Sequence, residues 1–334
     1  MIVSSNKILL LIRSYFLYPL LILIICLEIF LQGIFFFDIK SFKKTILFFN
    51  PYCDQSYWDY QGISSYDETK YLKHPILTLI KNKNKIFFKD HPVQPELISN
   101  KNLVFYGSSF IGHEYFIDNY KEKINFAIKS YGIDQIYKSY NLTKDNFPNR
   151  TIIIGFLLED IDRSIFELRN FPKLKYEKIN DNYEIKNTPV SFEKNKNRSI
   201  SFFTYNLAKN LIFLSFNNYN YKNNHCKAEF KKDIFKYFVD NIISNSKELN
   251  QNVIFVTFNF KDDINNLNWR HSFIKDYFLL NKINHIDTTK VIKSDQNIKK
   301  IDISKYYNNT DNHLSVYGFK IIKNAIDNSI KLYK

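Results

Sequence analysis

The strongest constraint on the fold is the alternation of short apolar runs with helix-like patterns between residues 101 and 334. Apolar runs of strand length occur at 102–106, 123–128, 151–158, 252–258 and 284–289. Between and after them, the spacing of apolar residues indicates helices at 110–120, from Ile133 onward, at about 227–247 and at 315–332. Strands that alternate with helices form parallel sheets with both faces covered. We therefore predict an α/β fold with a parallel five-stranded sheet flanked by helices.

A second constraint is the apolar segment from Tyr15 to Phe37. As a helix it would be about 34 Å long, which is enough to cross the hydrocarbon core of a bilayer. It is longer than the apolar region of a typical signal peptide, and no small-residue cleavage site follows it. Glu28 interrupts it at a cost of roughly 2.5–3.5 kcal/mol, which the surrounding Leu, Ile and Phe side chains offset. We predict one transmembrane helix that anchors the chain.

These patterns divide the chain into four parts and one insertion. Residues 1–14 form a short tail, residues 15–37 the anchor, residues 38–100 a connector that packs on the main domain, and residues 101–334 the main domain. The connector is expected to be partly helical near 75–81. A polar stretch at about 170–200 is predicted to be an insertion that contains a hairpin over 176–185, with a turn at Asp181 and Asn182.

The formal net charge of +14 raises the question of a nucleic-acid partner. Only six of the 47 basic residues are Arg, and the lysines are scattered along the chain. The sequence has no Arg cluster, no zinc-finger spacing and no RNA-binding aromatic motif. We expect no nucleic-acid partner.

The three cysteines give no reason to expect a metal. Cys26, Cys53 and Cys226 form neither a Cys-x-x-Cys motif nor a Cys/His cluster. Cys53 and Cys226 could form a disulfide if the body of the protein lies outside the cytoplasm, or could be two unrelated thiols.

A serine lies where the first predicted strand ends. Residues 107–110 read Gly-Ser-Ser-Phe, a glycine turn that leads into a helix. A serine at such a turn can expose its hydroxyl at the carboxyl edge of the sheet, close to the free N–H groups of the helix start. Ser109 is therefore a candidate nucleophile, although a serine at a helix start can also simply cap the helix. His113, four residues further on, is expected to face outward.

The other end of the domain carries a matching base. Asp311 precedes His313 by two residues, directly before the last predicted helix. A carboxylate can orient an imidazole, which can then take the proton of a serine hydroxyl.

Together these segments resemble the SGNH (GDSL-like) hydrolases. Residues 107–110 are similar to the first block of that family, Gly-Asp-Ser-Leu/Phe, with Ser109 at the nucleophile position and Ser108 replacing the usual Asp. Residues 311–318, with Asp311, His313 and Gly318, match the last block, Asp-x-His-Leu-x-x-x-Gly. The resemblance covers about residues 101–334 and implies a three-layer, flavodoxin-like sheet.

The middle blocks are less similar. Residues 125–135 resemble the second block, and Ser130 occupies the position of the usual oxyanion glycine. The resemblance implies that the backbone N–H groups of Ser109 and of Ser130 or Gly132 form an oxyanion hole. Where the third block normally has Asn–Asp, this chain has Glu159 and Asp160. A carboxylate at the Asn position would repel an oxyanion, and losing one donor typically costs about 3–4 kcal/mol.

The resemblance implies a serine-dependent ester hydrolase or acyl-transfer enzyme that requires no cofactor and no metal. Membrane-anchored members suggest O-acyl (acetyl) groups of cell-surface glycans as the substrate. Because of Glu159, the alternative is a weak or inactive SGNH-fold protein that acts in surface-polysaccharide assembly or as an interaction module.

The charges around the anchor do not decide its orientation. Lys7 and Arg13 precede it, whereas Lys40, Lys43 and Lys44 follow it, which slightly opposes a cytoplasmic N-terminus. The resemblance instead favours a cytoplasmic N-terminus. This makes the chain a single-pass protein of the cytoplasmic membrane whose body is extracytoplasmic or periplasmic.

Overall fold

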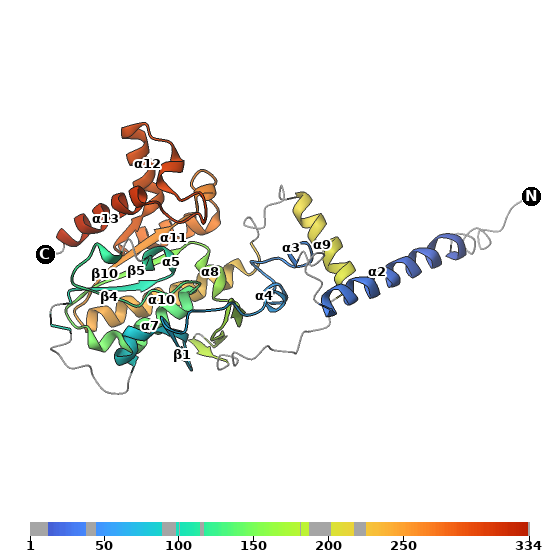
Figure 1. Cartoon of the computed structure of the whole chain (residues 1–334), viewed down its shortest axis with the longest axis horizontal. Helices are drawn as coiled ribbons and strands as arrows, with labels where there is room; N and C mark the ends of the chain where they lie inside the picture. Colours follow the sequence, from blue (N-terminus) through green and yellow to red (C-terminus); the bar gives the residue numbers. More distant parts are fainter. Residues whose placement is uncertain are drawn as a thin grey trace, which may run out of the picture. The chain divides into compact units, whose positions relative to one another are not determined.

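The structure is a computed structural model, and it describes residues 13–37, 45–88, 98–99, 101–113, 117–180, 182–186, 202–216 and 225–332. The chain divides into two compact units (Figure 1). The first unit contains residues 1–61 and 195–224, and the second contains residues 62–194 and 225–334. The predicted tail at 1–14 and the insertion beyond residue 186 lie largely outside the described residues.

The centre of the second unit is a five-stranded sheet in the order β11-β10-β5-β3-β4, and every neighbouring pair is parallel. This is the doubly wound, flavodoxin-like order 2-1-3-4-5. The predicted α/β fold with a parallel five-stranded sheet is confirmed. The strands are β3 (Leu103–Gly107), β4 (Lys123–Asn125), β5 (Thr151–Leu157), β10 (Asn252–Phe258) and β11 (His285–Asp287).

Successive residues of each strand pack into two different cores, because strand side chains alternate between the faces of a sheet. Val104 and Ile152 pack with helices α7 (Ile133–Thr143), α10 (Ala228–Glu248) and α11 (Trp269–Leu280). Phe105 and Ile153 pack with α5 (Ser109–Gly112), α12 (Thr288–Lys299) and α13 (Val316–Lys331). In Figure 1, α12 and α13 lie on one side of the sheet and α7 and α10 on the other.

Two glycines bring α5 unusually close to the sheet. Gly107 of β3 lies opposite Gly155 of β5. A Cβ on Gly107 would lie 2.0 Å from the Gly155 carbonyl oxygen, and a Cβ on Gly155 would lie 2.4 Å from Cβ of Ile111. Any side chain at either position would therefore push α5 away from the strand ends.

One local prediction is wrong, and another holds only in part. The segment 75–81 is not helical, because β1 (Tyr71–His74) and β2 (Thr78–Lys81) form an antiparallel hairpin. Its turn is held by Nδ1 of His74, which accepts hydrogen bonds from the N–H groups of Ile76 and Leu77. The helix predicted at 110–120 is interrupted: α5 ends at Gly112 and His113 is extended (φ −60°, ψ 127°), whereas Ile117 and Asp118 are helical again.

The predicted hairpin over 176–185 is confirmed as β8 (Tyr176–Ile179) and β9 (Asn182–Ile185), whose turn residue Asp181 lies outside the described residues. A smaller hairpin precedes it. The remaining elements of this unit are β6 (Leu168–Arg169), β7 (Phe171–Pro172), the short helix α8 (Asp160–Arg163) and the 3-10 helices η2 (Asn82–Phe88), η4 (Lys144–Asn146), η6 (Lys261–Asp263) and η7 (Ile303–Tyr306).

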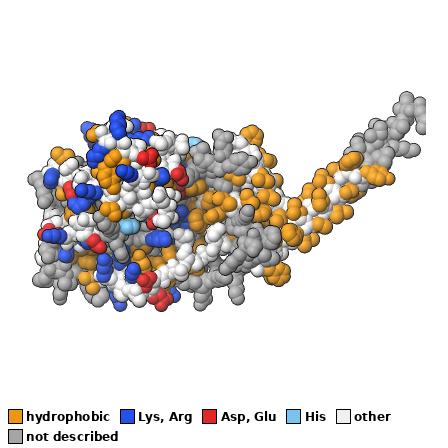
Figure 2. All heavy atoms as spheres, turned by 45° about the horizontal axis from the view of Figure 1, so that its top comes forward, with side chains coloured by type: hydrophobic (Ala, Val, Ile, Leu, Met, Phe, Trp, Pro, Cys, Tyr) orange, Lys and Arg blue, Asp and Glu red, His pale blue; other side chains and the backbone are white. Residues whose placement is uncertain are grey.

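The first unit is helical and rich in aromatic residues. Residues 15–36 form one continuous helical segment that is long and apolar enough to cross a membrane. Most of its side chains are exposed and form the hydrophobic surface of the rod in Figure 2. The helices of this unit are η1 (Arg13–Leu17), α2 (Tyr18–Phe36), α3 (Thr45–Phe48), α4 (Gln55–Gln61) and α9 (Phe203–Phe216).

Candidate active site

Ser109 is the first residue of α5, two residues after the glycine at the end of β3. The residue before it, Ser108, occupies the N-cap position, and its side chain makes no capping hydrogen bond. Because Ser109 lies inside the helix and not at its N-cap position, its hydroxyl is not placed as a capping group. Its own N–H is among the first N–H groups of the helix, which have no intrahelical acceptor.

His313 meets Ser109 across the carboxyl edge of the sheet. Nε2 of His313 lies 3.0 Å from Oγ of Ser109, within hydrogen-bond distance, although the two residues are far apart in the sequence. The ring of Phe110 stacks on the imidazole, with 4.6 Å between the ring centroids and 28° between the planes. This stacking limits rotation of the imidazole away from the serine.

Asp311 contacts the other side of the imidazole. Its Oδ2 lies 3.2 Å from Nδ1 of His313, which is an ion-pair distance, but Nδ1 has no partner with hydrogen-bond geometry. Its Oδ1 accepts a hydrogen bond of 3.1 Å from the His313 backbone N–H. Asn312, between them, is left-handed (φ 57°), a conformation that Asn tolerates better than most residues. Asp311 thus fixes the turn as well as the ring.

The last block is held against the 3-10 helix η7. Ser315 caps α13 by accepting a hydrogen bond from the Gly318 N–H, and its hydroxyl donates to the Lys305 carbonyl. A Cβ on Gly318 would lie 2.3 Å from the carbonyl oxygen of Tyr306. Only glycine fits there, which gives a physical reason for the glycine of the Asp-x-His-Leu-x-x-x-Gly pattern.

The imidazole is poised to accept a proton. Burial lowers the pKa of His313, the nearby His113 lowers it further, and the charge of Asp311 opposes both. A neutral imidazole at neutral pH is the form that a general base needs.

The prediction that His113 faces outward is wrong. Its ring packs on Phe319 at 5.0 Å and lies 6.0 Å from the ring of His313. The helix break at Gly112 turns this residue back toward the site.

The predicted oxyanion donors differ in availability. The Gly132 N–H donates to Oε1 of Gln135 at 3.3 Å, so it is already engaged at the start of α7. Ser130 is left-handed (φ 71°), the conformation for which glycine is favoured, and its Oγ accepts a hydrogen bond from Asn170. Of the three N–H groups, those of Ser109 and Ser130 therefore remain as candidates.

The third block places two carboxyl groups beside β5. Glu159 precedes α8, and its side chain is buried. Asp160 is fully buried. It accepts a hydrogen bond from the Leu157 N–H at 2.8 Å and forms an ion pair with Arg163 at 2.8 Å. Burial raises the pKa of Asp160 to about 6, against the opposing effect of Arg163.

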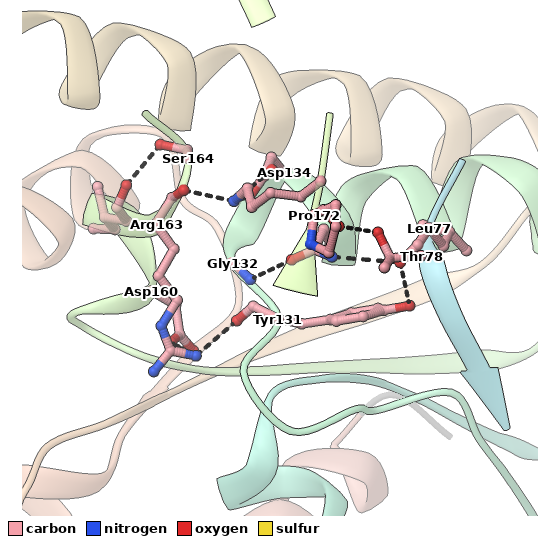
Figure 3. Close-up of polar contacts among 12 residues, drawn as sticks. Leu77, Thr78, Tyr131, Gly132, Asp134, Asp160, Arg163, Ser164 and Pro172 are labelled. Atoms are coloured by element: carbon pink, nitrogen blue, oxygen red, sulfur yellow. Dashed lines mark hydrogen bonds and ion pairs between the residues drawn. The ribbon is translucent and has the colours of Figure 1, made fainter. Parts of the chain in front are cut away.

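Arg163 links this block to the second block (Figure 3). Besides Asp160, its guanidinium donates to the Tyr131 carbonyl at 3.1 Å. Next to it, Lys173 forms a buried ion pair with Asp134 at 2.8 Å and donates to the Arg163 carbonyl. The charged side chains of Arg163 and Lys173 thus hold the loop that carries Ser130 in place.

The sequence analysis missed this network, as well as the buried pairs of Asp162 with Lys231 and Arg270. The only signal was that Asp160, Asp162 and Arg163 follow the most apolar strand directly. Among the described residues, no group of three or more His, Cys, Asp or Glu side chains could hold a metal ion.

Comparisons with known proteins add little. No family model matches the sequence, and no curated protein does. A solved structure of a provisionally assigned acylhydrolase from Bacteroides fragilis is similar over 75% of this chain and 93% of its own, with 14% sequence identity and a TM-score of 0.37. A match at this level carries no argument about function.

Proposed function

We propose that this protein is a membrane-anchored, SGNH-type serine hydrolase or acyltransferase. The observation that carries the proposal is the 3.0 Å contact between Oγ of Ser109 and Nε2 of His313 at the carboxyl edge of a doubly wound sheet. Ligands bind at this edge in open α/β sheets. A hydroxyl in hydrogen-bond contact with a largely neutral imidazole is an activated nucleophile.

The chemistry follows from the positions of these groups. His313 Nε2 takes the proton from Oγ of Ser109 as the oxygen attacks the carbonyl carbon of an ester. The negative charge that develops on the carbonyl oxygen is stabilised by the N–H groups of Ser109 and Ser130. His313 then gives the proton to the departing alcohol, which leaves an acyl group on Ser109. Water, or an acceptor hydroxyl in a transferase, removes that acyl group with His313 again acting as the base.

The substrate class and location come from the family resemblance. We propose O-acyl groups, in particular acetyl groups, of cell-surface glycans as the substrate. The segment 15–36 would anchor the chain in the cytoplasmic membrane, with the body on the extracytoplasmic side. Fold alone does not fix a substrate, so each part needs its own test.

Ester hydrolysis by matched serine variants tests the proposed chemistry. The purified chain in detergent is assayed with a small acetyl ester, and Ser109→Ala should reduce the rate to the background level. Ser304→Ala is the control, because it removes a serine hydroxyl whose hydrogen bond goes to Asp302 at the start of η7. Activity that survives in Ser109→Ala would exclude Ser109 as the nucleophile.

Glu159 favours a second candidate, a protein that keeps the fold but catalyses weakly or not at all. Its carboxyl group occupies the position where the family places an amide donor, and Asp160 next to it is also acidic. In that case Ser109→Ala and the unchanged protein would hydrolyse the ester equally slowly. The Glu159→Asn variant would then gain activity.

A further inference from the structure

Helix α9 exposes large apolar side chains. Tyr205, Leu211, Ile212 and Phe216 are 67%, 43%, 59% and 84% exposed, respectively. Tyr205, Ile212 and Phe216 follow a spacing of three to four residues per turn and so share one side of the helix. Lys209 is the only charged residue of α9. Lys209 lies on that side too, between Tyr205 and Ile212. Exposed apolar side chains grouped in this way mark a contact with a membrane or another molecule.

The opposite side of α9 packs on the C-terminal part of α2 (Figure 1). Phe203 stacks on Phe35, with 4.1 Å between the ring centroids, and lies in an aromatic cluster with Phe48, Phe49 and Tyr60. All of these residues belong to the first unit. α9 thus packs directly on α2, and its exposed apolar side faces away from that helix.

Glu28 fixes the position along α2 at which α9 begins. Its carboxylate accepts hydrogen bonds from the N–H groups of Phe203 (3.0 Å) and Thr204 (2.8 Å), and from the Thr204 hydroxyl (2.8 Å). Gln32 donates to the same carboxylate at 2.7 Å. The anomalous acid of the apolar segment is therefore a cap for the N-terminus of α9, where a negative charge is favourable.

The position of Glu28 lies inside the segment that could cross the membrane. Glu28 is eight residues before Phe36, or about 12 Å along the helix axis, whereas the segment Tyr15–Phe36 is about 33 Å long. A bilayer core is about 30 Å thick. If α2 crosses the membrane, the beginning of α9 thus lies at a depth that lipid occupies.

We propose that α9 is a second membrane element, which begins beside Glu28 of α2 inside the bilayer and has Tyr205, Ile212 and Phe216 in contact with lipid. Its 14 residues, about 21 Å of helix, are too few to cross a bilayer. The aliphatic stem of Lys209 can extend along the helix to bring its ammonium group to the headgroups. This inference rests on the proposed anchor.

Site-specific photo-crosslinking in proteoliposomes tests the inference. A benzophenone side chain replaces Leu23 of α2, Ile212 of α9, or the exposed aliphatic residues Leu280 and Ile298 of the second unit, one at a time in the full chain. The bilayer contains an alkyne-tagged phosphatidylcholine that reports lipid adducts. Lipid adducts at Ile212 should be within about threefold of those at Leu23 and roughly tenfold above those at Leu280 and Ile298.

The two proposals fail in different ways. Lipid adducts at Leu23 without adducts at Ile212 would overturn the role of α9 and leave the anchor intact. An adduct of Ile212 to a second protein molecule would likewise overturn it. Absence of lipid adducts at Leu23 would refute the anchor, and with it the inference. Equal labelling at Ile212, Leu280 and Ile298 would show non-specific contact and would also count against α9.

Discussion

The half-exposed position of Asp311 leads to a quantitative prediction for Asp311→Asn. The charges of Asp311 and a protonated His313 would be 3.2 Å apart. Coulomb's law gives about 1 kcal/mol for this separation in bulk water and about 5 kcal/mol at an effective dielectric constant of 20. Because the Asp311 side chain is 49% exposed, the value should lie toward the lower end, at roughly 1–2 kcal/mol.

This magnitude predicts a moderate loss of activity. At about 1.4 kcal/mol per factor of ten, kcat/KM should fall roughly 5- to 30-fold. A buried triad aspartate is worth about 10⁴ in kcat, so the expected loss is far smaller than that. The control is Asp145→Asn. Asp145 forms an ion pair with Lys144, and its side chain is 75% exposed, so this change should leave kcat/KM unchanged.

The pH dependence of kcat/KM tests the direction in which Asp311→Asn shifts the pKa of His313. The Asp311 charge raises the pKa of His313 against the effect of burial. Removing it should lower that pKa further, so the acidic limb of kcat/KM should move to lower pH while the plateau falls. The assay is hydrolysis of a small acetyl ester between pH 4 and 9. A loss of about 10⁴, or a limb that stays in place or moves to higher pH, would refute the role assigned to Asp311.

Two further predictions concern the support of the site. Lys173→Met should destabilise the fold by about 3–5 kcal/mol, because it leaves Asp134 buried without its ion partner at 2.8 Å. In denaturant titrations the double variant with Asp134→Leu should recover part of that loss, and no recovery would contradict the assigned pairing. Gly318→Ala should cost about 1–3 kcal/mol, because its Cβ would meet the Tyr306 carbonyl oxygen at 2.3 Å. Gly33→Ala, with no atom within 4 Å of the new Cβ, should be close to neutral, and equal effects in thermal melts would argue against the steric explanation.

The sheet was predictable because its signal is local. Strands β5 and β10 are almost entirely apolar, and such runs indicate buried parallel strands. The hairpin at 71–81 was not predictable, since its strands are short and its turn depends on the His74 side chain. Likewise, the inward turn of His113 depends on a helix break that glycine permits but does not require.

The candidate pair was predictable for a different reason. Ser109 follows β3, but His313 lies between η7 and α13 and not at a strand end, so the family resemblance paired them. The network beneath them was not predictable, because Arg163, Lys173 and Asp134 make contacts that no local spacing encodes. The capping role of Glu28 was not predictable either, since its partners Phe203 and Thr204 lie in a distant segment of the sequence.

The central claim is that Ser109 is a nucleophile activated by His313. The most direct measurement is labelling of the membrane-embedded, full-length chain with a fluorophosphonate probe, followed by mass spectrometry of the modified peptide. The account predicts one modified residue, Ser109, and loss of labelling in both Ser109→Ala and His313→Ala but not in Ser304→Ala. A folded protein that fails to react, or a probe attached to any other residue, would contradict it.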